Sequence, residues 1–342
     1  MGTRSLLAAA ALAFLAAMRV DAASMYTITD LGTLPGTTTS IATGINDLGQ
    51  VVGYSNNSIG ISPVAGSQSF LYSGGQLTSI GNPSLNDPAG GINNSGQVVG
   101  VGQFVNNSGQ VVGGPFQVPY NGTVNGVTTT LQATFSPVGI NDSGQIAGTI
   151  SRPLDMGGGT DAAIYQNGKV FDVGKALGLT DTTSVAVGID RAGDVLLYDY
   201  HRADNTSTYM IYKADGTSQV LTMGGPATAI NSAGQVVGSG QVVQDGGGVT
   251  GSGVLYTNGK YLSLPDLLPP SSQSFWTTLD PTAINDEGQI VGFGGTIGGP
   301  THAFLMTPTT PTPAPEPSTS AVLAAAIVAF SLREWARRRG QR

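Results

Sequence analysis

The stretch Ile45–Gly53, INDLGQVVG, decides the fold because it recurs along the chain. The later copies are INNSGQVVG from Ile92, INDSGQIAG from Ile140, a divergent IDRAGDVLL from Ile189, INSAGQVVG from Ile230 and INDEGQIVG from Ile284. The second position of the phrase advances by 47, 48, 49, 41 and 54 residues from copy to copy. A period of this length indicates an array of similar structural units.

A seventh copy, VNNSGQVVG from Val105, follows the second copy after only 13 residues. The segment from Val98 to Gly122 resembles the segment from Val236 to Gly259, in which no copy of the phrase occurs. We therefore interpret the seventh copy as part of an internal connection, and the sequence predicts six units.

Each unit is expected to contain two β-hairpins, and therefore four strands. In the repeated phrase, Asn closes an Asx turn and Gly takes the left-handed backbone conformation before the next strand. A second phrase joins an apolar strand to a tight turn: SFLYSGGQL from Ser69, AAIYQNGKV from Ala162, YMIYKADGT from Tyr209 and GVLYTNGKY from Gly253. The pairs Asn167-Gly168, Asp215-Gly216 and Asn258-Gly259 are predicted to supply the positive φ angles of tight hairpins.

Four short strands about every 48 residues predict an all-β fold, a β-propeller of about six four-stranded blades spanning residues 25–306. Strands such as Gln50–Gly53 lack clean polar alternation, as expected where neighbouring blades cover both faces of a sheet. The segment from Met25 to Gly32 resembles the last strand of a unit, but no earlier strands of that unit precede it. We expect this strand to pair with the segment His302–Met306 and to close the ring. The alternative is a sandwich or a pair of barrels.

Three of these phrases resemble a known family: the repeated nonapeptide, DLGTLPG from Asp30 and HAFL from His302. They are similar to extracellular HAF repeats, and the resemblance covers most of the body. It implies a surface location rather than an activity. Only the last unit keeps His-Ala-Phe, so the resemblance assigns the other units no equivalent histidine.

The N-terminal residues 1–22 are predicted to be a cleaved signal peptide with an N-terminal signal helix. Arg4 precedes an apolar run from Leu6 to Ala17, and small residues surround the expected cleavage site at Ala22 and Ala23. The alternative, a membrane helix, needs about 20 apolar residues, and this run is shorter.

The C-terminal segment has three parts. A Pro/Thr-rich linker, residues 307–317, ends in Pro315-Glu316-Pro317, and residues 318–342 carry an apolar run, expected as a single hydrophobic helix, followed by an arginine cluster. The cluster consists of Arg333, Arg337, Arg338 and Arg339. This order resembles a PEP-CTERM sorting signal. The resemblance implies two partners during export, signal peptidase and an exosortase-type membrane protease. It also implies that the segment is anchored transiently in the inner membrane, where the arginines hold it. The alternative is a permanent C-terminal anchor.

The charge of the body limits its partners. Between Met25 and Pro315 the chain has seven basic and 18 acidic residues, a net charge of −11, with no basic patch. Such a surface cannot neutralise a run of phosphates, so we expect no nucleic-acid partner. Cysteine is absent, so packing and backbone pairing must hold an exported fold of this size.

Residues with catalytic chemistry are few. His201 and His302 stand in unrelated contexts, and Glu287 is the only glutamate of the body. Asp47, Asp142 and Asp286 recur in the repeated turn, where turn chemistry explains them better than the alternative, a calcium site. No catalytic, cofactor-binding or metal residue is predicted.

The sequence therefore favours a non-enzymatic protein of a Gram-negative cell surface or extracellular matrix, associated with exopolysaccharide in a biofilm. The alternative is a secreted carbohydrate-active enzyme, a glycosidase or lyase on a propeller, whose carboxylates would converge in one cleft.

Overall fold

The computed structural model describes residues 25–58, 64, 66–80, 89–100, 103–124, 127–154, 158–179, 182–243 and 249–309. A compact unit spans Tyr26–Pro308. The predicted signal peptide with its cleavage site at Ala22 and Ala23 lies outside the described residues. So does the predicted sorting segment, with the residues Pro315, Glu316, Pro317, Arg333, Arg337, Arg338 and Arg339.

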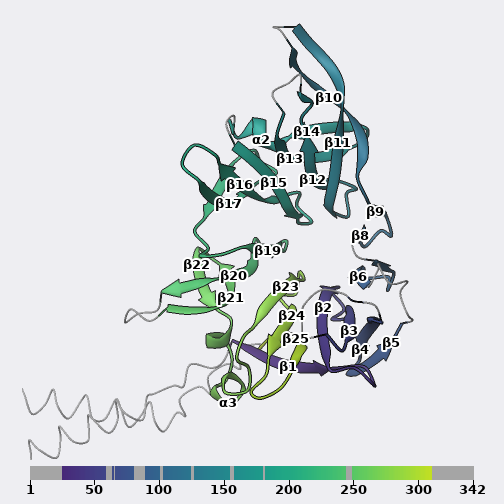
Figure 1. The fold of residues 1–342 in the computed structure, drawn as a ribbon, viewed down its shortest axis with the longest axis vertical. Coiled ribbons are helices and arrows are strands. Elements are labelled where there is room, and N and C mark those ends of the chain that lie inside the picture. Colours follow the sequence, from purple (N-terminus) through teal and green to yellow (C-terminus); the bar gives the residue numbers. More distant parts are fainter. Residues whose placement is uncertain are drawn as a thin grey trace, which may run out of the picture. The chain divides into compact units, whose positions relative to one another are not determined.

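The fold is all-β, and the described part of the chain forms seven small antiparallel sheets (Figure 1). We number the sheets as modules in the order of their repeated phrases. Module 1 contains β2 (Thr39–Ile45), β3 (Val51–Asn56), β4 (Gln68–Ser73) and β5 (Gln76–Ser79). Module 2 contains β6 (Ala89–Ile92) and β7 (Val98–Gly100), and module 3 contains β8 (Gln103–Val105) and β9 (Val111–Gly113).

The other four modules are larger. Module 4 contains β10 (Phe116–Val124), β11 (Val127–Ile140), β12 (Ile146–Ser151), β13 (Thr160–Gln166) and β14 (Lys169–Asp172). Module 5 contains β15 (Thr182–Ile189), β16 (Val195–His201), β17 (Thr206–Tyr212) and β18 (Ser218–Leu221). Module 6 contains β19 (Ala227–Ile230), β20 (Val236–Val243), β21 (Val249–Thr257) and β22 (Lys260–Ser263). Module 7 contains β23 (Asp280–Ile284), β24 (Ile290–Gly295), β25 (Thr301–Pro308) and β1 (Tyr26–Gly32).

Helical segments are short and lie in the connections. They are α2 (Val173–Ala176), the 3-10 helix η2 (Pro265–Leu267) and α3 (Pro270–Gln273). None of the helices in the described part of the chain has the length and apolarity to cross a membrane.

The repeated phrase forms the first hairpin of every module except module 4, where it joins β11 to β12 and follows the hairpin of β10 and β11. In module 1, the N–H of Asn46 donates to the carbonyl of Gln50 at 3.1 Å, and the N–H of Gly49 donates back to the carbonyl of Asn46 at 3.1 Å. Gly49 has φ +73°, which a residue with a Cβ rarely adopts. The same two hydrogen bonds close the turn in all seven copies, as the sequence predicts.

The seventh copy is not an internal connection, so the prediction of six units was wrong. Its turn at Asn106 joins β8 to β9 in a sheet of its own. The prediction weighed the 13-residue spacing above the phrase itself. The turn keeps the features of the other copies, which are the Asn106 and Gln110 side-chain contacts and the positive φ of Gly109. A module can therefore consist of this hairpin alone.

The expectation of four strands in every unit is correct for modules 1, 5, 6 and 7 only. Within the described residues, modules 2 and 3 have two strands each, and module 4 has five. The Asn167-Gly168 and Asn258-Gly259 turns have two positive φ angles, as predicted. The Asp215-Gly216 turn differs, because only Gly216 has a positive φ and the Lys213 N–H donates to the Thr217 carbonyl across a longer loop.

Apolar side chains from neighbouring modules pack against each other. Val51 and Phe70 of module 1 contact Val291 and Ala303 of module 7 in one buried cluster, and Val237 of module 6 joins another cluster with module 7. Similar clusters connect modules 1 and 2, 4 and 5, and 5 and 6. Every residue of β3 is buried, which confirms that both of its faces are covered. Burial of this apolar surface from water stabilises each junction.

The N-terminal strand completes the last module, as predicted. β1 pairs with β25, with Tyr26 opposite Pro308 and Ile28 opposite Met306 (Figure 1). The hydroxyl of Tyr26 also donates to the carbonyl of Gly288 in the turn of module 7 at 3.1 Å. This pairing removes the open edge that β25 would otherwise present.

Candidate functional site

The amide side chain of the repeated Asn is buried and hydrogen-bonded on both ends. In module 1, the Oδ1 of Asn46 accepts from the N–H groups of Leu48 and Gln50 at 3.1 and 2.9 Å. Its Nδ2 donates to the Oε1 of Gln50 at 2.8 Å and to the carbonyl of Asn93 in module 2 at 2.8 Å. A primary amide has two donor hydrogens and one acceptor oxygen, so this side chain has no unused capacity.

The Asn side chains form a relay that passes from each module to the next. The Nδ2 atoms of Asn93, Asn106 and Asn141 donate to the carbonyls of the next copies at 2.8, 2.6 and 3.2 Å. Asn231 of module 6 donates to Asn285 of module 7 at 2.9 Å, and Asn285 donates to Asn46 of module 1 at 2.9 Å. The last contact joins residues 239 apart in sequence and returns the relay to its first member.

The relay has one break, at Asp190 of module 5. A carboxylate has no donor hydrogen, and no hydrogen bond within the described residues joins the Asp190 side chain to Asn231. Asp194 replaces the Gln of the other copies, and its N–H donates to Asp190 Oδ1 at 2.9 Å. Burial raises the pKa of Asp190 to about 6; hydrogen bonds from nearby N–H groups lower this pKa, and the charge of Asp194 raises it.

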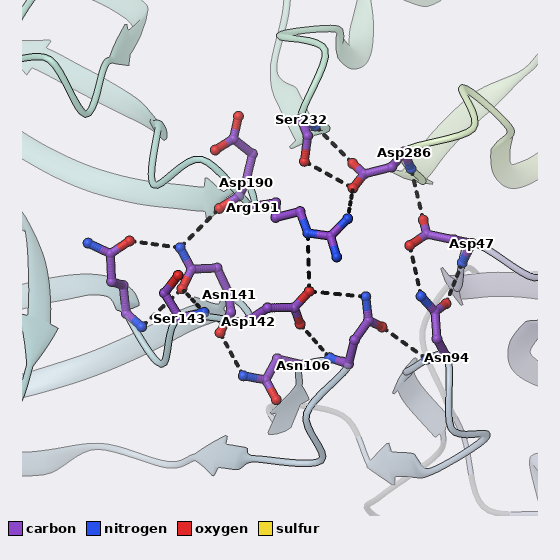
Figure 2. A network of polar contacts seen from close by, with 12 residues as sticks. Asp47, Asn94, Asn106, Asn141, Asp142, Ser143, Asp190, Arg191, Ser232 and Asp286 are labelled. Carbon is purple, nitrogen blue, oxygen red and sulfur yellow. Dashed lines mark hydrogen bonds and ion pairs between the residues drawn. The ribbon is translucent and has the colours of Figure 1, made fainter.

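A second series of contacts joins the residues that follow the Asn. The backbone N–H of Asp47 donates to Asn94 Oδ1 at 2.8 Å (Figure 2). The N–H of Asn107 donates to Asp142 Oδ1 at 2.8 Å. The N–H groups of Ser232 and Asp286 donate to Asp286 Oδ1 and Asp47 Oδ1 at 2.9 and 3.0 Å. The recurring carboxylates therefore accept hydrogen bonds from neighbouring modules. The sequence predicted turn residues, and the contact between modules is additional.

Arg191 interrupts the second series and contributes a positive charge. Its guanidinium lies 3.5 Å from Asp142 Oδ2 and 4.0 Å from Asp286 Oδ2 (Figure 2). These two carboxylates belong to modules 4 and 7, so Arg191 of module 5 connects modules that are not consecutive in the chain. Its side chain is 63% exposed, and such pairs contribute little to stability.

These turns surround a cavity of about 180 Å³, the turn cavity. The apolar residue that precedes each turn lines it, from Ile45 to Ile284, together with Asp47, Asp142, Asp190 and Asp286. Four carboxyl groups and one guanidinium give the lining an acidic balance when Asp190 is ionised. A cavity of this size can hold water or a small polar molecule but not an extended polysaccharide.

A second set of polar groups lies between modules 4 and 5, and its two carboxylates are buried. Asp161 is 1% exposed and Asp199 is fully buried. Arg152 Nε lies 3.1 Å from Asp161 Oδ2, and His201 Nε2 lies 2.8 Å from Asp199 Oδ2. Burial raises the pKa of Asp161 to about 6; Asp172 raises this pKa, Arg152 lowers it and Asp199 raises it.

The two histidines lie apart, on different modules. His201 ends β16, and His302 in β25 has its Nδ1 atom 2.9 Å from Asp30 Oδ2 on β1. Each histidine contacts one carboxylate. Ser184, near Asp161, contacts neither histidine in the described hydrogen bonds; its hydroxyl accepts from the Ala162 N–H at 3.0 Å. Glu287 is an exposed residue of its turn. Nowhere in the described ranges do three or more His, Asp or Glu side chains form a group suited to a metal ion.

Comparison with known proteins adds no identification, since neither a protein-family model nor a curated protein matches this chain. The assignment of a function therefore depends on the residues themselves. Sequence reasoning selected the repeated Asn and Asp correctly as turn residues. It did not anticipate that their side chains reach the next module, nor the role of Arg191. The one signal available was the Gln that follows the Gly in six of the seven copies, which no simple turn requires.

Proposed function

We propose that the chain is a non-enzymatic exported surface protein whose body is a closed β-propeller of seven blades. It is sorted by its C-terminal segment through an exosortase-type system and associates with exopolysaccharide at the surface of a Gram-negative cell. The observation that carries the scaffold role is the Asn relay, which links successive modules with one break at Asp190 and joins the last module to the first. A body held together in this way is rigid and can present its loops in fixed positions.

The propeller arrangement is supported by three independent contacts between the ends of the array. Asn285 donates to the Asn46 carbonyl at 2.9 Å, the Thr282 hydroxyl donates to the Ala42 carbonyl at 2.9 Å, and Phe70 packs in one cluster with Val291. The Thr hydroxyls of Thr43 and Thr228 make the equivalent contact with the next module. Modules that contact both neighbours, including the first and the last, satisfy the requirement for ring closure.

The sorting role is supported by the order of the C-terminal parts and by where the body ends. β25 ends at Pro308, and the Thr/Pro linker with Pro315-Glu316-Pro317 follows at once. Since Tyr26 lies opposite Pro308, removal of a signal peptide at Ala22 or Ala23 would leave β1 intact and paired. Neither processing step would then disturb the fold.

The enzymatic alternative is less well supported by the geometry. The carboxylates Asp47, Asp142 and Asp286 converge on the turn cavity, but each accepts a backbone N–H from another module. Asp161 has a raised pKa, but it lies between two sheets and only 1% of it is exposed. A polymer therefore cannot reach it. A glycosidase needs two carboxyl groups that reach the substrate.

The proposal is tested by expressing the full chain in a bacterium that has an exosortase-type protease. We expect a shortened protein in the surface and matrix fractions, and co-sedimentation with the matrix polysaccharide. The triple variant P315A/E316A/P317A should stay full-length in the inner membrane, while the linker variant P311A/P313A, which leaves β25 unchanged, is sorted normally. Equal distribution of both variants contradicts the sorting role. Release of reducing ends from the polysaccharide by the purified chain would favour the enzymatic alternative.

A further inference from the structure

A groove of about 500 Å³ lies beside β14 and α2 in module 4. Lys169 and Phe171 of β14, Lys175 of α2 and Pro119 of β10 line it, together with Asp172. Its volume is within the range of pockets that bind small organic ligands, and it is larger than the turn cavity.

The groove gathers two of the seven basic residues of a strongly acidic body. Both lysines are exposed, and neither takes part in the ion pairs within the described residues, which involve Arg152, Arg191, His201 and His302. The Oδ1 of Asp172 accepts from the Lys175 N–H at 2.8 Å, so the carboxylate caps the start of α2. Two ammonium groups and one carboxylate leave the groove with a net positive charge, opposite to that of the body.

Phe171 adds an aromatic surface to the groove. Its side chain is 47% exposed, and its ring centre lies 5.8 Å from that of Tyr212 in module 5. Contact with Tyr212 holds the ring in place, and the exposed part of the ring remains available. An apolar ring face gains free energy when it covers apolar C–H groups, such as those on one face of a pyranose.

We propose that this groove binds acidic sugar residues, uronates, of the polysaccharide with which the protein associates. The inference rests on the proposed function and adds the site and the sugar class. Lys169 and Lys175 pair with the carboxylates of the sugar, and the pyranose packs on Phe171. Charge selects this ligand, because a neutral sugar would leave both ammonium groups unpaired and the acidic surface elsewhere repels a polyanion.

Module 6 provides a natural comparison within the same chain. β22 carries Lys260 and Leu262 at the positions of Lys169 and Phe171, and Asp266 stands six residues after Lys260, as Lys175 does after Lys169. The equivalent place therefore has one lysine, a leucine at the position of Phe171 and an opposing charge. The same hairpin without the groove chemistry supplies matched control positions.

The test is calorimetric titration of the purified full chain, in detergent, with a hexamer of galacturonate and a hexamer of galactose. We expect binding of the acidic hexamer only, weakened by added salt. The variant K169Q/K175Q should lose about tenfold in affinity and F171L about fivefold, since each exposed charge pair contributes up to about 1 kcal/mol and an aromatic contact contributes about as much. The control K213Q/K260Q, with the same change in net charge, should bind like the wild type.

Three results would overturn the inference. Equal losses in both double-lysine variants would show that net charge alone attracts the sugar. Tighter binding of the neutral hexamer would remove the role of the lysines. Absence of binding to either hexamer rejects the groove as a sugar site, whereas the sorting of the chain, measured by fractionation, would be unaffected.

Discussion

Asn285 Nδ2 donates a hydrogen bond of 2.9 Å to the backbone carbonyl of Asn46, 239 residues earlier in the chain. This contact joins the last copy of the repeated phrase to the first. It uses the same atoms that join consecutive copies elsewhere. Each turn is therefore both a local hairpin and a connector, and the two roles share one side chain.

The first prediction concerns this connector. N285A removes the donor to Asn46 and leaves the Gln289 N–H without its acceptor, so we expect a loss of about 3 kcal/mol in the free energy of unfolding. Chemical denaturation measures it. E287A, an exposed change in the same turn, should cost less than about 0.5 kcal/mol. Similar losses in both variants would show that the relay does not stabilise the body.

The second prediction tests the module count. Deletion of residues 94–106 removes one copy of the phrase together with β7 and β8. If this copy were only an insertion within a loop, the body would tolerate its loss. Because the copy is a module, its loss removes one member of the relay between Asn46 and Asn141. We expect a chain that does not unfold cooperatively by circular dichroism. A deletion variant with wild-type stability would restore the six-unit interpretation.

The third prediction uses the break at Asp190. The pKa of Asp190 is raised to about 6, above its ordinary value near 3.8, so the folded state binds this proton more tightly than the unfolded state does. The stability it contributes is complete below about pH 4 and is lost as the pH rises through 6.

D190N/D194Q supplies the amide donor and the Gln of the other copies. We expect it to raise the free energy of unfolding at pH 8 by about 1 kcal/mol and to change it less at pH 4. Denaturation curves at both pH values measure the difference. D215N/D204N, two exposed carboxyls, serves as the control. A gain of equal size at both pH values would contradict a role for the Asp190 proton.

The fourth prediction concerns the buried pair of Arg152 and Asp161. R152Q removes the positive charge that opposes the raised pKa of Asp161. The variant should therefore be destabilised by about 3 kcal/mol at pH 8, where Asp161 is ionised, and less at pH 5, where it holds a proton. R202Q, an exposed arginine of module 5, should have little effect at either pH. Thermal unfolding at both pH values decides between these outcomes.

The fifth prediction concerns closure by β1. A chain that begins at Thr33 loses the strand that covers β25 and the contact of Tyr26 with Gly288. We expect it to form oligomers on size-exclusion chromatography, because an unpaired edge strand adds other chains. A synthetic peptide of residues 25–32 should restore the monomer, and the same peptide with Ile28 replaced by Pro should not. Oligomers that persist with the wild-type peptide would contradict closure by this strand.

The sequence by itself determined the hairpins, because each depends on residues within one turn. Asn46, Gly49 and Gln50 lie within five positions, and the left-handed glycine and the Asx contact are local properties. Pairing of β1 with β25 was also readable, since a strand without neighbours at one end of an array and an open edge at the other satisfy each other. The turn at Asp215 was misjudged because loop length, not only the Asp-Gly pair, sets the φ angles.

Only the tertiary structure decided what the turn side chains reach. The partner of each Asn Nδ2 is a carbonyl 13 to 239 residues away, and nothing within a turn specifies that distance. For the same reason the seventh copy could not be placed by its spacing, and Arg191 could not be connected to Asp142 and Asp286. Local chemistry fixes each hairpin, whereas packing of one module against the next fixes which hairpins meet.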